Sequence, residues 1–144
     1  MLYLLIFILY YSSKNIDIVI ILIIVYRGGR EVFGEMYKKF FIKLEEPQYI
    51  KTMKLKILVE IANENSYQEI LEELEEYVND VHAGFSKFSI VCAGSIAMRI
   101  DKSINSVVGM LKSFLNRKID YIVSEALCVV KSNIILKLTL ININ

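Results

Sequence analysis

Short apolar runs recur after residue 53 and predict β-strands. The run Lys56–Ile61 is rich in β-branched residues, and Phe88–Ala93 and Ile119–Val123 repeat this character. Ile135–Ile143 closes the chain with a further apolar stretch. Runs of this length, bounded by polar turns, are typical of strands buried in a parallel sheet.

Amphipathic helices are expected between these runs. Apolar residues return every three or four positions from Ser66 to about Val81, and again from Ser103 to Leu115. Acidic residues cover the rest of the first segment as a solvated face. Because strands and helices alternate and such crossovers are right-handed, the sequence predicts an α/β fold, a three-layer parallel sheet with helices on both faces.

The first 26 residues predict an apolar N-terminal helix. Two apolar runs flank a polar patch that contains Lys14 and Asp17. A single spanning helix needs about 20 residues, and the cost of two central charges nearly balances the gain from the apolar residues. Pairing of Lys14 with Asp17 favours insertion. The basic residues that follow would leave the remainder on the cytoplasmic side, so we expect a cytoplasmic protein anchored to a membrane by residues 1–26.

Residues 27–52 are expected to form a glycine hinge and an amphipathic helix. Gly28 and Gly29 break the apolar run, and Pro47 ends the helix. The helix would lie either on an anionic membrane surface or against the following domain. In a third interpretation, residues 1–52 precede a working protein that begins at Met53. The expected division is therefore 1–26, 27–52 and 53–144.

Composition narrows the function classes. Lys and Arg number 17 against 16 Asp and Glu, for a net charge of +1, so no basic surface indicates nucleic acid. Two cysteines and one histidine exclude a disulfide scaffold and a cysteine-built zinc site. No metal and no cofactor are expected. A hydrophobic fraction of 55% excludes a disordered chain.

Candidate binding residues follow the carboxyl ends of the expected strands, where open parallel sheets bind their ligands. They are Asn63 after the first strand, Gly94 and Ser95 after the second, and Ser124 and Glu125 after the third. Gly94 would let the backbone approach a small anion beside the amides of a helix start. The sequence has no glycine-rich nucleotide motif, so an ordinary turn glycine is the alternative.

Cys128 is the candidate catalytic residue. It lies one helical turn beyond the third expected strand, where a helix dipole would favour its thiolate. Its apolar neighbours support simple packing as the alternative. Cys92, within the second expected strand, is expected to be a core residue, and His82 a helix cap.

The block from Met53 to about Ile134 resembles the DsrE-like family of small sulfur-metabolism proteins, shortened at its C-terminus. The resemblance rests on KILVEIANEN, LEEYVND, FSIVCAGSIAM and MLKSFLNRKIDYIVSEAL. It implies a five-stranded flavodoxin-like sheet, a homo-oligomer, and sulfur passed as a persulfide on a cysteine after the strand that matches Ile119–Val123. The family cysteine falls on Ser124, which leaves Cys128 as the candidate carrier.

The leading expectation is therefore a sulfur carrier, or a non-enzymatic component of a sulfur relay, with a sulfur donor or acceptor protein as partner. One alternative is a module without catalysis that binds a small anion or another protein and is tethered to a membrane. A second is a membrane-associated structural protein whose essential part is residues 1–46.

Overall fold

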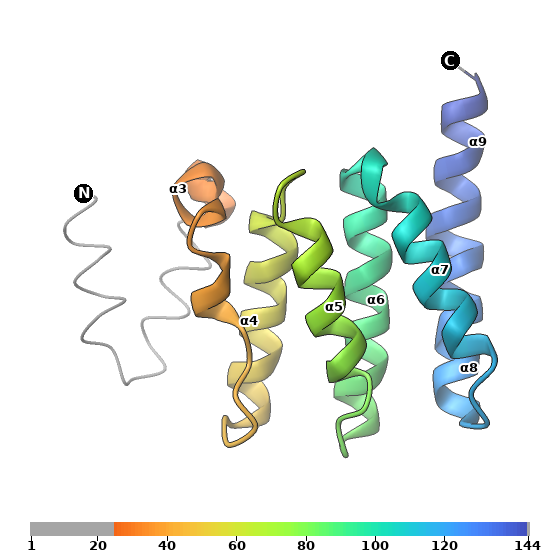
Figure 1. The fold of residues 1–144 in the computed structure, drawn as a ribbon, viewed down its shortest axis with the longest axis horizontal. Helices are drawn as coiled ribbons and strands as arrows, with labels where there is room; N and C mark the ends of the chain where they lie inside the picture. The colour runs from red at the N-terminus through yellow and green to blue at the C-terminus, as the bar shows by residue number, and fades with distance from the viewer. Residues whose placement is uncertain (1–24, 144) are drawn as a thin grey trace. The chain divides into compact units, whose positions relative to one another are not determined.

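The computed structural model describes residues 25–143, which form helices joined by short loops and contain no β-strand (Figure 1). The chain divides into two compact units between Ile61 and Ala62. The expected α/β, flavodoxin-like sheet is therefore wrong. Each run expected to be a strand lies within a helix, except that Ile119 directly precedes one.

The first unit contains four described helical segments. They are η1 (Val25–Gly29), α3 (Arg30–Gly34), η2 (Tyr37–Phe40) and α4 (Gln48–Ile61). Phe33 and Phe40 are buried and meet edge to face, with ring centroids 6.1 Å apart. Pro47 does not end a long helix as expected. Its carbonyl accepts the Ile50 and Lys51 amides at the start of α4, because a proline is well suited to a helix start.

Ion pairs tie α4 to the segments that precede it in this unit. Arg30 Nη2 lies 2.6 Å from Glu60 Oε2. Lys54 is buried, and its ammonium pairs with the Glu46 carboxylate and donates to the Phe41 carbonyl at 3.4 Å. A buried lysine needs such partners because an isolated charge away from water is costly.

The second unit is built from two pairs of helices. Its elements are α5 (Tyr67–Tyr77), α6 (Ala83–Arg99), η3 (Asp101–Ser103), α7 (Ile104–Leu115), α8 (Asp120–Val129), η4 (Val130–Ile134) and α9 (Ile135–Ile143). Helix α5 packs on α6 and α7 packs on α8, while α6 lies beside α8 and α5 beside α7. Figure 1 shows the resulting two layers, α5 and α7 in one and α6 and α8 in the other.

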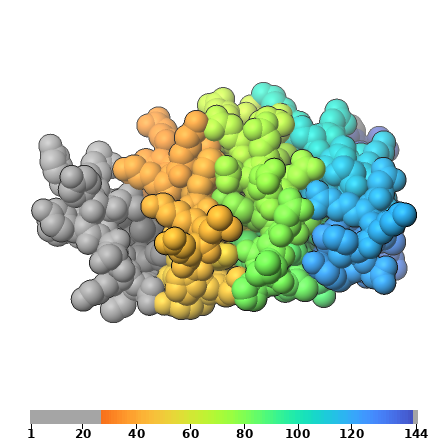
Figure 2. All heavy atoms as spheres, turned by 60° about the horizontal axis from the view of Figure 1, so that its bottom comes forward, coloured from red at the N-terminus to blue at the C-terminus, as the bar shows by residue number. Residues whose placement is uncertain are grey.

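Side chains close the space between these ribbons. In Figure 2 the second unit, green to blue, presents a continuous surface of packed atoms. Helix α8 passes through η4 into α9 with helical backbone angles at both junctions. The segment 120–143 therefore acts as one long helix.

The two helix pairs repeat with a period of 37 residues. Helices α5 and α7 begin 37 residues apart, and so do α6 and α8. Several buried positions follow the same period: Phe85 corresponds to Ile122, and Cys92 to Val129. Each pair buries its apolar faces against its neighbour, which is how stacked helical repeats build one continuous core.

Gly94 lies in the middle of α6 and not in a turn at the end of a strand. A Cβ atom at this position would be 2.5 Å from Val129 Cγ1 and 2.9 Å from Asn133 Nδ2. The missing side chain lets α6 and the long α8 helix approach closely. The expected role of Gly94 as a turn glycine is therefore wrong, because the glycine serves helix packing.

The apolar segment expected to span a membrane lies almost wholly outside the described residues. Among residues 25–143, no helix is both long and apolar enough to cross a membrane. The expected division at residues 26 and 52 stays a prediction, and Met53 lies within α4.

Candidate functional site

Helices α5 and α7 meet along a polar seam in which contacting residues are 38 positions apart. We call this contact the α5–α7 seam. Two hydrogen bonds join the helices themselves, from Ser106 Oγ to Gln68 Oε1 at 3.1 Å and from Ser113 Oγ to Glu75 Oε1 at 3.3 Å. Two more join the segments that flank them, from Lys102 Nζ to Glu64 Oε2 at 2.5 Å and from Arg117 Nη1 to Asn79 Oδ1 at 2.8 Å. Gln68 and Glu75 share one face of α5, and Glu64 and Asn79 lie just before and just after this helix, so the four bonds form a ladder along the seam.

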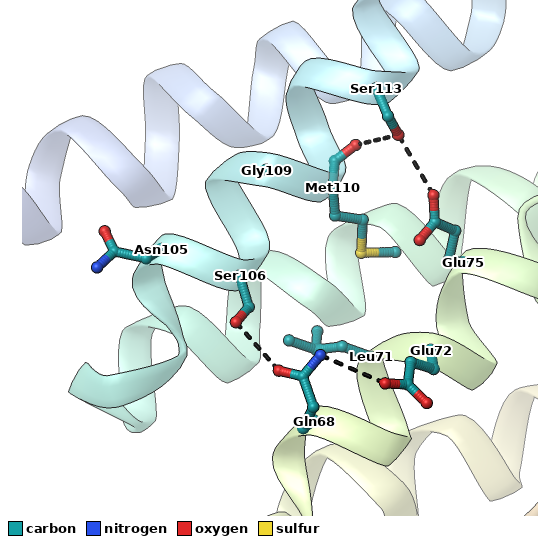
Figure 3. Close-up of a pocket in the computed structure, with 9 residues that line it drawn as sticks. All are labelled: Gln68, Leu71, Glu72, Glu75, Asn105, Ser106, Gly109, Met110 and Ser113. Carbon is teal, nitrogen blue, oxygen red and sulfur yellow. Dashed lines mark hydrogen bonds between the residues drawn. The ribbon is translucent and has the colours of Figure 1, made fainter.

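A groove of about 370 Å³ opens in the middle of this ladder (Figure 3). Its lining residues are Gln68, Leu71, Glu72, Glu75, Asn105, Ser106, Gly109, Met110 and Ser113. The bonds of Ser106 and Ser113 bound it along the helix axes, as the dashed lines in Figure 3 show. Between these bonds, Gly109 presents no side chain, and a Cβ there would meet nothing within 4 Å.

The groove combines an acidic wall with apolar contacts. Glu72 and Glu75 come from α5, whose sequence holds five glutamates and no lysine or arginine. Glu72 Oε1 accepts a long hydrogen bond of 3.4 Å from Gln68 Nε2. Leu71 and Met110 contribute apolar surface and are both buried. The groove can therefore contact methylene groups and a positive charge together.

The cations at the two ends of the seam already have partners. The pKa of Lys102 is raised above its ordinary value, first because its ammonium donates to Glu64 and then because of the attraction between the two charges. Arg117 bonds to Asn79, and its guanidinium lies over the Phe114 ring at 4.7 Å from the centroid. Neither residue lines the groove.

Metal chemistry has no support among the residues that the structure describes. These residues hold no group of three or more His, Cys, Asp and Glu side chains that could bind a metal ion. The glutamates of α5 that lie outside the groove are ordinary solvated groups.

The structure does not bring the sequence-predicted binding residues together at one edge. Asn63 precedes α5, where its Oδ1 accepts the Asn65 and Ser66 amides at 2.9 and 3.1 Å. Ser95 follows Gly94 within α6 and donates to the Val91 carbonyl at 3.1 Å. Parallel strands would have aligned these residues at one edge, but the chain places them in a loop and in the middle of a helix.

The remaining candidates all lie on α8. Ser124 and Cys128 are exposed and one helical turn apart, and Glu125 is half-buried. The Cys128 carbonyl accepts a hydrogen bond from Ser132 Oγ at 2.8 Å. Cys128 lies in the interior of this long helix, away from the dipole at its start. The buried Cys92 packs as a core residue, as expected.

The sequence pattern of single helices does not predict the groove residues, because they come together only when one helix pair packs on the next. A signal was present: Ser66 and Ser103 are 37 positions apart, both are buried, and each precedes a helix. Their hydroxyls bond to the backbone of Asn63 and Ile100, which are themselves 37 positions apart. A search for internal periodicity would have placed α5 beside α7.

Stacked helix pairs with a fixed period define a helical-repeat protein of the solenoid class. The sequence pattern of the adaptin N-terminal region matches residues 10–137. The chain therefore belongs to the adaptin N-terminal-region family.

Curated relatives support this assignment. The chain is 37% identical over 100 residues to Beta-adaptin-like protein A of Arabidopsis thaliana, which is 69% of this chain and 12% of the relative. It is 28% identical over 122 residues to human AP-1 complex subunit beta-1, or 85% and 12%. It is 37% identical over 94 residues to the AP-2 complex subunit beta of Saccharomyces cerevisiae, or 65% and 13%. The chain spans about an eighth of the length of these relatives.

These matches correct the DsrE-like resemblance and what it implied. The adaptin match covers the whole block from Met53 to Ile134 on which that resemblance rested. A sulfur relay through Cys128, with a sulfur donor or acceptor and a homo-oligomer, is therefore wrong. The quoted segments lie in helices α4 to α8 and in the turns between them, and the apolar runs of these helices resemble those of an α/β protein.

The expected membrane anchor is corrected as well. The adaptin match begins at residue 10 and thus includes most of the apolar segment 1–26. The cytoplasmic, membrane-tethered protein expected from the sequence rested on that segment as a spanning helix. The adaptin match over this stretch overturns that expectation.

Proposed function

We propose that this chain is a segment of the helical scaffold of a β-type adaptor-complex subunit, of the kind that works in vesicle coats. The observation that carries the proposal is the adaptin match over residues 10–137, together with relatives that are named as β subunits of AP-1 and AP-2 complexes. The 37-residue helix pairs supply a scaffold's main property, since each repeat contacts its neighbours and extends a continuous core.

A chimera with the yeast relative tests this function. The 94-residue region of the S. cerevisiae AP-2 β subunit that matches this chain would be replaced by the corresponding residues of this chain. We expect the chimera to co-purify with the other AP-2 subunits in the same ratio as the natural subunit. The repeat contacts that shape the scaffold would be retained, although about two thirds of the matched residues differ.

A matched control keeps the outcome interpretable. The same chimera with Ile90→Asp places a charge at a fully buried position of α6 and is expected to lose the complex. A chimera that resists proteolysis as the natural subunit does, yet fails to co-purify with the other subunits, would contradict the proposed function.

A further inference from the structure

The groove in the α5–α7 seam interrupts an otherwise regular pattern. Elsewhere on the seam, a residue of the α5 side bonds to the residue 38 positions later. The same step from Glu72 leads to Met110. The thioether of a methionine is uncharged and is only a weak hydrogen-bond acceptor. The Glu72 carboxylate therefore has no cation on the opposite helix at its own place in the ladder.

Elsewhere on the seam a carboxylate is bound by a lysine ammonium, at Glu64, or by a serine hydroxyl, at Glu75. At one end the Glu64 carboxylate pairs with the Lys102 ammonium, and at the other the Asn79 amide oxygen accepts from the Arg117 guanidinium. Each cation is thus held by its own partner. Lys112, another cation of α7, is not among the residues that line the groove.

The groove lining fits one side chain type in particular. An arginine has an apolar stem that can pack on Leu71 and Met110 and a planar guanidinium that can donate to Glu72 and Glu75 together. Gly109 leaves the space for it, because nothing lies within 4 Å of where its Cβ would be. A volume of about 370 Å³ is of the size that binding clefts have.

We propose that the groove binds an arginine side chain of a partner polypeptide. The guanidinium takes the place of the missing cation opposite Glu72, and its donors pair with the carboxylates of the acidic wall. This inference goes beyond the proposed function and does not depend on it, since the groove lies within one unit of the chain alone.

Peptide binding to the full chain tests the proposal. The probe is a fluorescent eight-residue peptide of alternating arginine and glycine, followed by fluorescence anisotropy at 50 mM salt. The same peptide with citrulline in place of arginine keeps the shape and removes the charge, and it is expected to bind at least 10-fold more weakly. The same peptide with lysine in place of arginine is expected to bind at least about threefold more weakly. A lysine ammonium lacks the planar, forked arrangement of donors with which a guanidinium bridges two carboxylates.

Two variants separate the groove from the general acidity of α5. Glu72→Gln removes one charge inside the groove and is expected to weaken binding of the arginine peptide about 10-fold. Glu76→Gln removes one charge from the same helix, one turn away and outside the lining, and should change binding less than twofold. Gly109→Leu fills the groove without changing charge and should weaken binding to the level of Glu72→Gln.

Several results would overturn the proposal. If Glu72→Gln and Glu76→Gln weaken binding equally, the peptide recognises only the charge of the helix. Equal affinity for the arginine and citrulline peptides would show that no guanidinium is bound, and equal affinity for arginine and lysine would exclude the fork geometry. Both charge variants change exposed residues, so their circular dichroism spectra and melting temperatures should match those of the parent chain.

Discussion

The two seams of the second unit join the same pair of repeats in opposite ways. On one side, α6 approaches α8 so closely that a Cβ at Gly94 would lie 2.5 Å from Val129. On the other, α5 and α7 are joined by polar side chains and leave an open groove at Gly109. Both glycines lie inside helices, yet one is required by packing and the other leaves free space. The closest packing between the two repeats therefore lies in the α6–α8 seam, and the α5–α7 seam is the more open of the two.

The largest effect on the free energy of unfolding is expected from a change at Ile90. This residue is fully buried in α6, whereas Leu127, its counterpart 37 residues later, is 52% exposed. Ile90→Ala should lower the free energy of unfolding by about 2–5 kcal/mol, because it leaves a cavity in a packed core. Leu127→Ala should cost less than about 1 kcal/mol. Urea unfolding followed by circular dichroism measures both, and equal losses would contradict the contrast between buried and exposed layers.

Gly94→Ala tests the close approach of α6 and α8. The added methyl group would collide with Val129, whose β-branched side chain has few alternative rotamers. We expect a loss of about 1–3 kcal/mol, after an intrinsic helix gain of up to about 1 kcal/mol. The double variant Gly94→Ala with Val129→Ala should recover part of this loss in a double-mutant cycle. Additive effects of the two changes would show that the contact does not set the helix separation.

Gly109→Ala tests the open seam with the same substitution. A Cβ at this position meets nothing within 4 Å, so the alanine gains helix propensity without a clash. The expected result is a stabilisation of about 0.5–1 kcal/mol, opposite in sign to the effect of Gly94→Ala. The melting temperatures of both variants, measured under identical conditions and compared with that of the parent chain, give the sign of each effect. Destabilisation by Gly109→Ala would mean that α7 packs more tightly at this position than the groove implies.

The sequence pattern correctly predicted the helices that have one solvent-exposed face. Ile70, Leu71 and Leu74 are buried in α5, and Ile104, Val107 and Leu111 are buried in α7, as their spacing predicts. These helices keep polar residues on the opposite side, so their period of 3.6 is visible. The expected extension of the first helix to Val81 is wrong, because α5 ends at Tyr77 and Val81 is 92% exposed.

Helices α4 and α6 were mistaken for strands because they are buried on more than one side. The run at the start of α8 was mistaken for a strand because its exposed side also carries large apolar residues, Ile119 and Tyr121. A short apolar run cannot be assigned to strand or helix by periodicity alone. In α6 two serines obscure the helical pattern of the sequence, because Ser86 and Ser89 stand among the apolar positions although both are buried. Ser89 Oγ donates to the Phe85 carbonyl one turn earlier at 3.0 Å, so the buried hydroxyl is satisfied within its own helix. The groove was missed for a related reason, as its two walls are adjacent only once the 37-residue period is known.

The smallest effect is expected at the solvent-exposed end of the α5–α7 seam. The pKa of Lys102 is raised above 10.5 in the folded chain, first by its hydrogen bond to Glu64 and then by the charge of that carboxylate. Because the folded pKa exceeds the unfolded one, the pair contributes to stability below pH 10.5 and loses this contribution as the pH rises through the folded pKa. Glu64→Gln should return the pKa toward 10.5, as measured by NMR titration of the lysine side chain, and 1 M salt should act in the same direction through screening. An unchanged titration in Glu64→Gln would show that this ion pair is not formed in solution, and that the seam is held by its other three hydrogen bonds.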